Sequence, residues 1–526
     1  MFDAAEAAVT AEHFDVLIIG AGLSGIDAAY HLQKFCPNKS YVILEQRDQI
    51  GGTWDLFRYP GIRSDSDMLT MGYSFRPWTS PKAISSGDAI REYLTATAHD
   101  EGIDRHIRFR HRIQCASWSS EEAQWTIDVA RRLPDGRDEP VRLTTNFLFS
   151  CAGYYRYSEG YTPEFPGARH FAGRIVHPQG WPEDLDYAAK RVAIIGSGAT
   201  GVTLLPAMAK TAGHVTMLQR SPTYVVSVPE QDKIANSLRR RLPAMWAYRL
   251  SRWKNIAYMM YVYQLARRYP NFVKARILRK TQAELGADYD VATHFTPRYN
   301  PWEQRLCLAP DGDFFQAIKS GRASVITDEI DRFTERGIQL KSGRQLEADI
   351  VVTATGLVLQ AFGGAELSVD GRRVDPGRTL AYKGVMLSGV PNFASVFGYI
   401  NASWTLKADL ICAYVCRLLN FMDRKGARQV RPKSFDETAA APFVENFTPG
   451  YIQRAIGNWP KQGAKAPWRV YQNYIRDRIS LQWSSIDDDA LEFSNPSSPR
   501  PAMQATELLD HPPLEWLQEP GAKSRQ

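Results

Sequence analysis

The first part of the chain follows a strand–helix–strand pattern of apolar and polar positions. Phe14–Ile19 is a short apolar run rich in β-branched residues, which is typical of a strand buried in a parallel sheet. Residues 26–35 then carry helical spacing, and Tyr41–Leu44 predicts the next strand. A strand, a helix and a second strand in this order predict a βαβ unit.

Glycines stand where the first strand meets the helix. Gly20 allows a tight turn, Gly22 lets the backbone approach a pyrophosphate, and Gly25 lets helix and strand pack closely. Ser24 lies in the same turn, at the helix N-terminus, which favours bound negative charge. Glu45 ends the second strand, where a carboxylate binds a ribose hydroxyl. Together these features predict a dinucleotide site.

A second unit of the same kind begins at Arg191–Ile195. Its turn is formed by Gly196, Ser197, Gly198, Ala199, Thr200 and Gly201. A helical stretch and the strand Val215–Leu218 follow, but this strand ends in Gln219, Arg220 and Ser221 instead of an acid. A guanidinium in that place suits a 2′-phosphate, so this site should prefer NADPH to NADH. Two unlike units predict an enzyme that passes electrons from NADPH to a second nucleotide, FAD.

The chain is expected to leave and re-enter the first unit at two similar places. Each is an apolar strand followed by a turn of small residues, at residues 147–153 and 349–356. The expected fold class is α/β with two Rossmann-like domains. Residues 1–153 and 350–485 are expected to form a discontinuous FAD domain, residues 154–349 an inserted NADPH domain, and residues 486–526 a loose tail. Between the first unit and residue 147, the pattern predicts an amphipathic helix over residues 89–98. It also predicts a β-meander over residues 107–129, which include Ile113.

Composition narrows the class of protein. The chain has 526 residues, 44% of them hydrophobic, which is ordinary for a globular protein of two or three domains. Its six cysteines form no Cys-x-x-Cys pair, so a zinc cluster or a redox dithiol is not expected. The same cysteine usage predicts a reducing, cytoplasmic location. The first residues carry no basic region typical of a secretory signal, and no apolar run is long enough to span a membrane.

The net charge of +7 comes from one segment. Residues 233–280 hold 13 of the 64 Lys and Arg residues and no Asp or Glu, so the remainder of the chain is net acidic. Helical character over 238–248 and 253–268 places these charges beside Trp and Tyr within a helical insertion of about residues 230–290. Peripheral contact with an anionic membrane or a partner is one interpretation. A solvated basic face on an insertion over the substrate entrance is favoured instead, and no motif supports nucleic-acid binding.

The motifs resemble those of the class B flavoprotein monooxygenases, specifically the Baeyer–Villiger monooxygenases. The fingerprint of that family, between its two dinucleotide motifs, is present as Phe171, Gly173, His177 and Trp181 followed by Pro. Residues 51–65, a Gly-Gly-x-Trp loop that ends in Tyr-Pro-Gly and Asp, and the Ala-Thr-Gly at 354–356 match further motifs. Within the family the chain is most similar to the ethionamide-activating type, through residues 58–68 and 295–305.

The resemblance implies an activity and assigns roles to residues. Asp65 and Arg305 would be the active-site pair in an enzyme that inserts oxygen from O2 next to a ketone carbonyl, through a C4a-peroxyflavin, and gives an ester or lactone. A fixed cation stabilises the anionic oxidant and the adduct that follows, and the carboxylate orients that cation. His177 would be a linker residue. The other residues expected to bind cofactor are Gly52, Thr53, Trp54, Arg63, Ser64, Ile113 and Gln304, the last where many relatives carry Lys.

Other functions remain open from the residues alone. The partners expected are O2 and a small ketone, with sulfide oxidation as an additional activity. An N- or S-oxygenating flavin-containing monooxygenase is the nearest alternative, although Pro after Trp181 favours the Baeyer–Villiger branch. A disulfide reductase shares the two-nucleotide layout but needs a redox cysteine pair, and a flavin-binding sensor would consume no NADPH.

Overall fold

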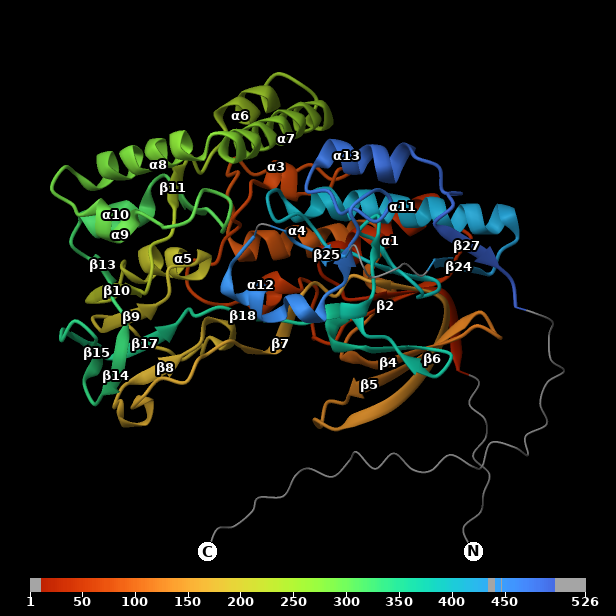
Figure 1. The fold of residues 1–526 in the computed structure, drawn as a ribbon, viewed down its shortest axis with the longest axis horizontal. Helices are drawn as coiled ribbons and strands as arrows, with labels where there is room; N and C mark the ends of the chain where they lie inside the picture. Colours follow the sequence, from red (N-terminus) through yellow and green to blue (C-terminus); the bar gives the residue numbers. More distant parts are fainter. Residues whose placement is uncertain (1–10, 434–439, 446, 497–526) are drawn as a thin grey trace, which may run out of the picture.

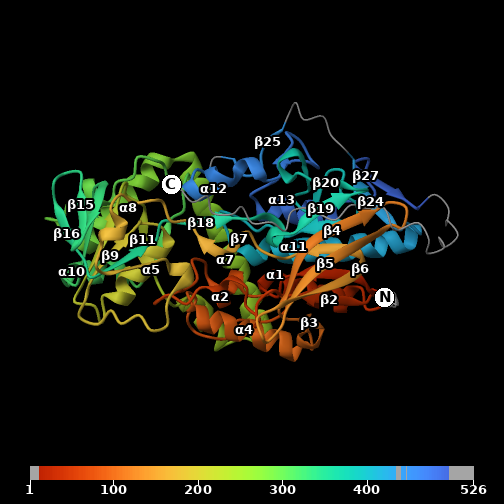
Figure 2. The ribbon, with the colours of Figure 1, turned by 90° about the horizontal axis from the view of Figure 1, so that it is seen from below.

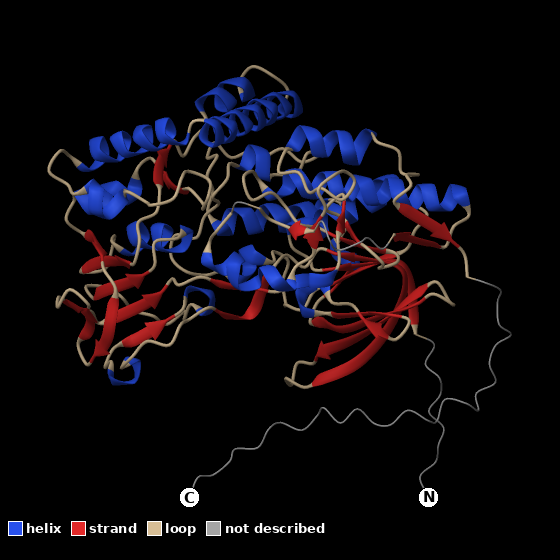
Figure 3. Cartoon of the chain, in the orientation of Figure 1, coloured by secondary structure: helices blue, strands red, loops and turns tan. Residues whose placement is uncertain are grey.

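The computed structural model describes residues 11–433, 440–445 and 447–496, and it shows two sheets side by side with helices along one edge (Figures 1 and 3). The larger sheet carries the first glycine turn and the smaller sheet carries the second. Figure 2 shows the same two halves from below.

The larger sheet is built from both ends of the described chain. β1, β2 and β6 pair in parallel at its centre, and β23 pairs with β6 although it lies far later in the sequence. Its strands run in the order β20 (Arg372–Arg373), β19 (Glu366–Val369), β4 (His111–Ser119), β5 (Gln124–Arg132), β6 (Asp138–Ser150), β1 (Glu12–Ile19), β2 (Tyr41–Leu44) and β3 (Ile107–Arg108), with β23 (Phe393–Ser395) beside β6. The meander predicted over 107–129 is confirmed for β4 and β5, which pair antiparallel, whereas β3 pairs in parallel with β2 at the far edge of the sheet.

Helices on the larger sheet are α1 (Leu23–Phe35), α4 (Gly87–Asp100) and α11 (Trp404–Lys425). The helix predicted over 89–98 is confirmed as α4, whose N-cap Ser86 accepts a hydrogen bond from the backbone of Ala89. α11 packs on α1 and is buried on most of its length because it runs through the hydrophobic core of this half.

The smaller sheet is parallel and has the order β13 (Ala323–Thr327), β10 (His214–Gln219), β9 (Arg191–Ile195), β17 (Ile350–Thr353) and β8 (Arg174–Val176). It is covered by α5 (Ala199–Met208) and α10 (Asp313–Lys319). β14 (Ile330–Thr334), β15 (Gly337–Leu340) and β16 (Gln345–Glu347) add an antiparallel meander.

Two expected boundaries are wrong. The sequence placed residue 350 at the start of the returning first domain, but β17 pairs with β9 and β8, so the second sheet continues through Thr353. The chain crosses back after this strand, where β18 (Leu357–Leu359) pairs with the outgoing strand β7 (Tyr155–Gly160). The loose tail expected from residue 486 is also wrong at its start, since β27 (Leu491–Ser494) pairs with β24 (Gln429–Pro432). The rest of that tail, 497–526, lies outside the described residues.

The basic segment forms helices along the edge that Figure 1 draws uppermost. They are α6 (Lys233–Arg239), α7 (Ala244–Arg268) and α8 (Pro270–Leu285), and the short helix α9 (Val291–Phe295) follows the segment. The expected division into helices over 238–248 and 253–268 is wrong. Pro243 cannot continue a helix because it lacks an N–H, and it instead caps a single α7 that runs from Ala244. No helix among the described residues is long and apolar enough to cross a membrane.

Candidate active site between two glycine turns

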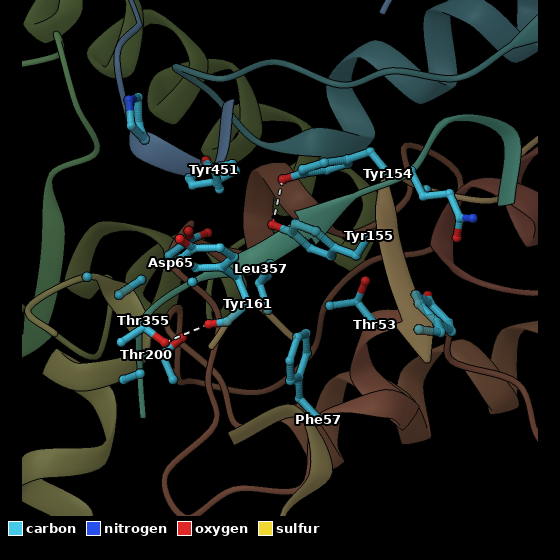
Figure 4. Close-up of a pocket in the computed structure, with 18 of the residues that line it drawn as sticks. Thr53, Phe57, Asp65, Tyr154, Tyr155, Tyr161, Thr200, Thr355, Leu357 and Tyr451 are labelled. Atoms are coloured by element: carbon cyan, nitrogen blue, oxygen red, sulfur yellow. Dashed lines mark hydrogen bonds between the residues drawn. The ribbon is translucent and has the colours of Figure 1, made fainter. Parts of the chain in front are cut away.

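A cleft of about 1280 Å³ lies between the two halves and is lined by residues of both glycine turns. Side chains from both sheets, from the strand pair β7–β18 and from α12 (Gly450–Ala455) point into it (Figure 4). The volume exceeds that of an ordinary drug-sized pocket of about 300–1000 Å³, and it suits large ligands.

The first glycine turn is shaped by the close packing that its sequence predicted. Gly20 has φ +96°, and a Cβ on Gly25 would lie 1.9 Å from the carbonyl oxygen of Gly20. α1 begins at Gly22 with no side chain capping its free N–H groups. Helices α4, α6 and α9 elsewhere in the described chain begin on a Ser or Asp cap. Uncapped N–H groups that face a cleft are a ready site for a pyrophosphate, so the turn fits a dinucleotide.

Glu45 holds the first turn as well as lining the cleft. Its Oε2 accepts a hydrogen bond from the N–H of Ala21 at 2.8 Å, and its Oε1 accepts one from the N–H of Arg47 at 2.9 Å. The side chain is only 3% exposed. Burial raises the pKa of Glu45, against these two hydrogen bonds. The carboxylate therefore shapes the backbone that would receive a ribose and phosphate.

The loop that follows β2 completes the first half of the cleft. Gly52 has φ +56°, and a Cβ there would lie 3.1 Å from Cα of Gly22, so the two glycines let the loop meet the turn. Thr53 and Trp54 begin the short helix α2 (Thr53–Leu56) and line the cleft. Ile113, on β4, is buried and also lines it. Ser24 lines the cleft too, and its Oγ accepts a hydrogen bond from Nε1 of Trp404 at 2.8 Å.

The second glycine turn repeats the geometry of the first. Gly196 has φ +116°, and a Cβ on Gly201 would lie 2.2 Å from the carbonyl oxygen of Gly196. α5 begins at Gly198 without a side-chain cap, and a Cβ on Gly198 would meet nothing within 4 Å. Ala199 and Thr200 open this helix beside the cleft. The turn thus offers a second set of unpaired N–H groups.

The residues that follow the second strand of each unit differ in exposure, and those of the second unit are more exposed than Glu45 of the first. Arg220 is exposed and follows the buried Gln219 at the end of β10. Ser221 accepts a hydrogen bond through its carbonyl oxygen from Oγ of Ser197 at 3.2 Å. Arg220, Ser221 and Gln304 all line the cleft.

Asp65 and Arg305 meet in the cleft between the two turns. Nη2 of Arg305 lies 2.6 Å from Oδ2 of Asp65, and Nη1 donates to the carbonyl oxygen of Ile400 at 3.3 Å. Burial is the largest single influence and opposes the charge on Arg305, but Asp65 together with the neighbouring Tyr451, Tyr154 and Tyr155 outweighs it, and the pKa of Arg305 is raised. The guanidinium is therefore charged at any physiological pH and held in place from two sides.

Arg63 and Ser64, which were predicted to bind cofactor, use their polar groups in contacts with other protein residues. Arg63 forms an ion pair with Asp313, across 250 positions of sequence. The backbone N–H of Ser64 donates to the carbonyl oxygen of Ser85 at 2.8 Å, and its Oγ accepts from the N–H of Ser85 at 3.1 Å. Both residues line the cleft, but their polar groups hold the loop around Asp65 in place.

The fingerprint residues lie in the linker between the halves. Nε2 of His177 donates to the carbonyl oxygen of Gly356 at 3.1 Å, and its Nδ1 accepts from the N–H of Gln179. Burial lowers the pKa of His177, so the ring is neutral. A Cβ on Gly173 would lie 2.2 Å from the carbonyl oxygen of Asp349. These contacts join the outgoing and returning chain segments.

The other fingerprint residues are aromatic. Phe171 is buried and packs its ring edge on Phe333, and Trp181, half-buried, packs on Tyr187. The four residues thus brace the linker, and none of them is among the residues that line the cleft.

An aromatic wall was not predicted. The hydroxyls of Tyr154 and Tyr155 lie 2.7 Å apart (Figure 4). The ring of Tyr154 also stacks on Trp404. Tyr451 reaches the same place from α12. The pair Tyr154–Tyr155 directly follows the small-residue turn after β6, a signal that sequence reasoning had available. Tyr451 carries no such local signal.

The fold and the cleft define a class of protein, an α/β flavoprotein with two dinucleotide-binding units. Residues 13–272 match the model of the flavin-binding monooxygenase-like family. The chain is 54% identical over 485 residues to the FAD-containing monooxygenase EthA of Mycolicibacterium smegmatis, covering 92% of this chain and 97% of that protein. The chain therefore belongs to the flavin-binding monooxygenase family.

Solved structures agree with the fold. A steroid monooxygenase bound to NADP matches with a TM-score of 0.70 at 22% identity, over 92% of this chain and 100% of that one. Cyclohexanone monooxygenase from Rhodococcus sp. Phi1 bound to NADP+ matches with a TM-score of 0.67 at 20% identity, over the same shares. The predicted two-domain α/β fold and the resemblance to flavoprotein monooxygenases are thus confirmed.

Proposed function

We propose that this flavin monooxygenase is a Baeyer–Villiger enzyme that uses FAD and NADPH to insert one oxygen atom of O2 next to a ketone carbonyl, giving an ester or lactone, and that it also oxidises sulfides. The observation that carries the proposal is the Arg305–Asp65 pair, 2.6 Å apart in the cleft between the two glycine turns. Bound flavin, once reduced, supplies the activation of O2.

Arg305 supplies the positive charge that this reaction requires. Negative charge develops on oxygen when a carbonyl is attacked, and a preorganised cation stabilises it most strongly where water is excluded. Asp65 keeps the guanidinium in one orientation, so the side chain does not reorient toward solvent. The aromatic residues Tyr154, Tyr155 and Tyr451 line the same part of the cleft and keep water from the reacting atoms.

NADPH is assigned to the second glycine turn. Gln219 stands where the first unit has Glu45, which removes the repulsion of a phosphate, and Arg220 offers a guanidinium fork. FAD is assigned to the first turn, where Glu45 and the loop at Gly52 enclose the cleft. The cyclohexanone monooxygenase that shares the fold is named for a ketone and was solved with NADP+, which supports the same reaction here.

The alternative is an N- or S-oxygenating flavin-containing monooxygenase, and products separate the two. Purified holoenzyme with NADPH and ¹⁸O₂ is given a cyclic ketone, an aliphatic ketone, a tertiary amine and a thioether, and products are identified by gas chromatography and mass spectrometry. We expect labelled lactone or ester and labelled sulfoxide. N-oxide formation with no ester from either ketone would favour the alternative.

Arg305→Ala tests the assigned role of the guanidinium. We expect the variant to bind flavin and to lose ester formation by about 100-fold or more, as removal of a charge-stabilising group commonly does. Arg373→Ala, at the exposed edge strand β20, is the matched control and should keep full activity. Wild-type ester yield from Arg305→Ala would remove this residue from the reaction.

A further inference from the structure

The longest helix of the basic segment turns an apolar and basic face outward. On α7, Trp246, Leu250 and Trp253 are exposed together with Arg249, at the spacing of one helix face, and Tyr261 continues that face two turns later. Trp246 is 61% exposed and Tyr261 is 63% exposed. A face solvated by charge alone would not carry two Trp residues, so the expectation of a plain solvated basic face is incomplete.

Neighbouring elements extend this face. Ile234 on α6 is exposed, and Phe272 on α8 is exposed beyond the far end of α7. On the other side, Ile475 and Ile479 are exposed at α13 (Tyr474–Arg478) and the π-helical turn after it, and Trp483 is 67% exposed. Figure 1 shows α6, α7, α8 and α13 along one edge of the molecule.

Direct contacts join α7 to α13. The ring of Trp253 packs edge-on against Tyr474, with ring centres 5.8 Å apart. The guanidinium of Arg478 lies over Trp253 at 5.0 Å and over Trp483 at 5.3 Å. These contacts place α7, α13 and the turn to Trp483 on one surface. We call the exposed apolar and basic residues of α7, α13 and that turn, with those of the adjoining α6 and α8, the α7 face.

The charge on the α7 face has one sign. Residues 233–280 contain 13 basic and no acidic residues, and Arg240, Arg241, Arg267 and Arg268 are exposed. In a symmetric contact with a second copy, the basic residues of one chain would face those of the other. Repulsion between these like charges disfavours self-association through this face. Trp and Tyr with flanking Arg and Lys are the residues that settle at the boundary between lipid head groups and acyl chains.

We propose that the α7 face docks this enzyme peripherally on an anionic lipid surface. Aromatic and aliphatic side chains enter the head-group region, and the arginines bind lipid phosphates and acidic head groups. The helix lies in the plane of the membrane and does not cross it.

The inner side of α7 connects this surface to the cleft. Met259, Met260 and Tyr263 line a small cavity together with Tyr399 and Ala402. Tyr399 and Ala402 also line the main cleft. A membrane bound to the outer side of α7 would therefore lie one helix away from the part of the cleft that Tyr399 and Ala402 line, which gives lipid-dissolved substrates a short path.

Vesicle co-sedimentation of the full-length holoenzyme tests the proposal without any activity assay. Phosphatidylglycerol/phosphatidylcholine vesicles and pure phosphatidylcholine vesicles are compared at low and high salt. We expect binding to the anionic vesicles that weakens as salt rises, and about tenfold weaker binding to the neutral ones. Equal binding to both compositions, or no binding to either, would overturn the proposal.

Two sets of variants separate the charge from the apolar contribution. Arg249→Glu with Arg268→Glu, and Trp246→Ser with Tyr261→Ser, should each reduce anionic-vesicle binding about tenfold or more. Arg169→Glu with Arg372→Glu, two exposed arginines far from the α7 face, is the charge-matched control and should bind as wild type. Flavin content and thermal midpoint verify that each variant is folded. A concentration-dependent dimer that the α7 variants abolish, without vesicle binding, would assign the face to a second copy.

Discussion

The two glycine turns have nearly the same backbone and opposite surroundings. In both, the third glycine would place a Cβ about 2 Å from the carbonyl oxygen of the first, 1.9 Å for Gly25 and 2.2 Å for Gly201. Glu45 at the tip of the first unit is 3% exposed and hydrogen-bonded to its own turn, whereas Arg220 at the tip of the second is exposed. An enclosed cradle suits a ligand that stays bound, and an open cradle suits one that must enter and leave.

The covering helices show the same contrast. α1 is covered by α11, and Trp404 of α11 donates a hydrogen bond into the first turn at Ser24. A buried polar cluster of Asp27, His31 and Asp409 also lies between these helices. α5 of the second unit packs through apolar residues such as Leu204 and Leu205. The first unit therefore has a closed interface that holds a polar cluster within its apolar core, and α5 of the second packs through apolar residues beside an open cleft.

Matched glycine substitutions should separate the two units most strongly. Gly25→Ala and Gly201→Ala introduce almost the same clash with a backbone carbonyl, so any difference between them reflects the ligand. We expect Gly25→Ala to lose the flavin, measured as the 450 nm to 280 nm absorbance ratio. Gly201→Ala should keep the flavin but be reduced by NADPH on the order of 100-fold more slowly in anaerobic stopped-flow.

The control for the glycine pair is Gly180→Ala, where a Cβ would meet nothing within 4 Å, and it should behave as wild type. The assignment of FAD to the first turn fails if Gly25→Ala stays yellow while NADPH reduction is lost. It also fails if Gly201→Ala is the variant that emerges without flavin and still folded.

Arg220→Gln should sharpen the comparison through coenzyme preference. Because Arg220 is exposed and lines the cleft, its loss should remove contacts to a 2′-phosphate without disturbing the fold. We expect KM for NADPH to rise about tenfold, equivalent to about 1.4 kcal/mol, with kcat/KM for NADH changed less than about twofold. Arg169→Gln is the control. An unchanged ratio of NADPH to NADH efficiency would show that Arg220 does not read the phosphate.

Sequence reasoning found the two turns because a tight turn and a close helix–strand approach impose glycines at fixed local spacing. It found Asp65 and Arg305 only through the resemblance. Contacts between distant segments leave no such local pattern. The ion pair of Arg63 with Asp313 and the arrival of Tyr451 in the cleft depend on how the halves pack. The place of β17 was misjudged for the same reason, since a strand followed by a small-residue turn fits either sheet.

The smallest expected effect concerns the polar cluster of Asp27, His31 and Asp409 between α1 and α11 of the first unit. Nε2 of His31 lies 3.1 Å from Oδ1 of Asp409 and 3.6 Å from Oδ1 of Asp27. Burial opposes the charge on His31, but its hydrogen bond with Asp409 and the charge of Asp27 outweigh burial, and the pKa of His31 is raised above 6.5. A raised histidine pKa contributes stability that is fully present below the unfolded pKa and is lost as pH rises through the folded one.

This sign gives a test in a defined pH window. The thermal midpoint of wild type should exceed that of His31→Gln most at pH 6, and the difference should shrink as pH rises above 6.5, read by flavin fluorescence. His214→Gln is the control in the second unit, because His214 is a half-buried histidine on β10 whose Nε2 contacts Oγ of Ser324 at 2.9 Å. If the difference in thermal midpoint between wild type and His31→Gln instead grew as pH rises, the folded protein would favour the neutral form of the His31 ring. The contrast between the two units would then depend only on the buried Glu45 and the exposed Arg220.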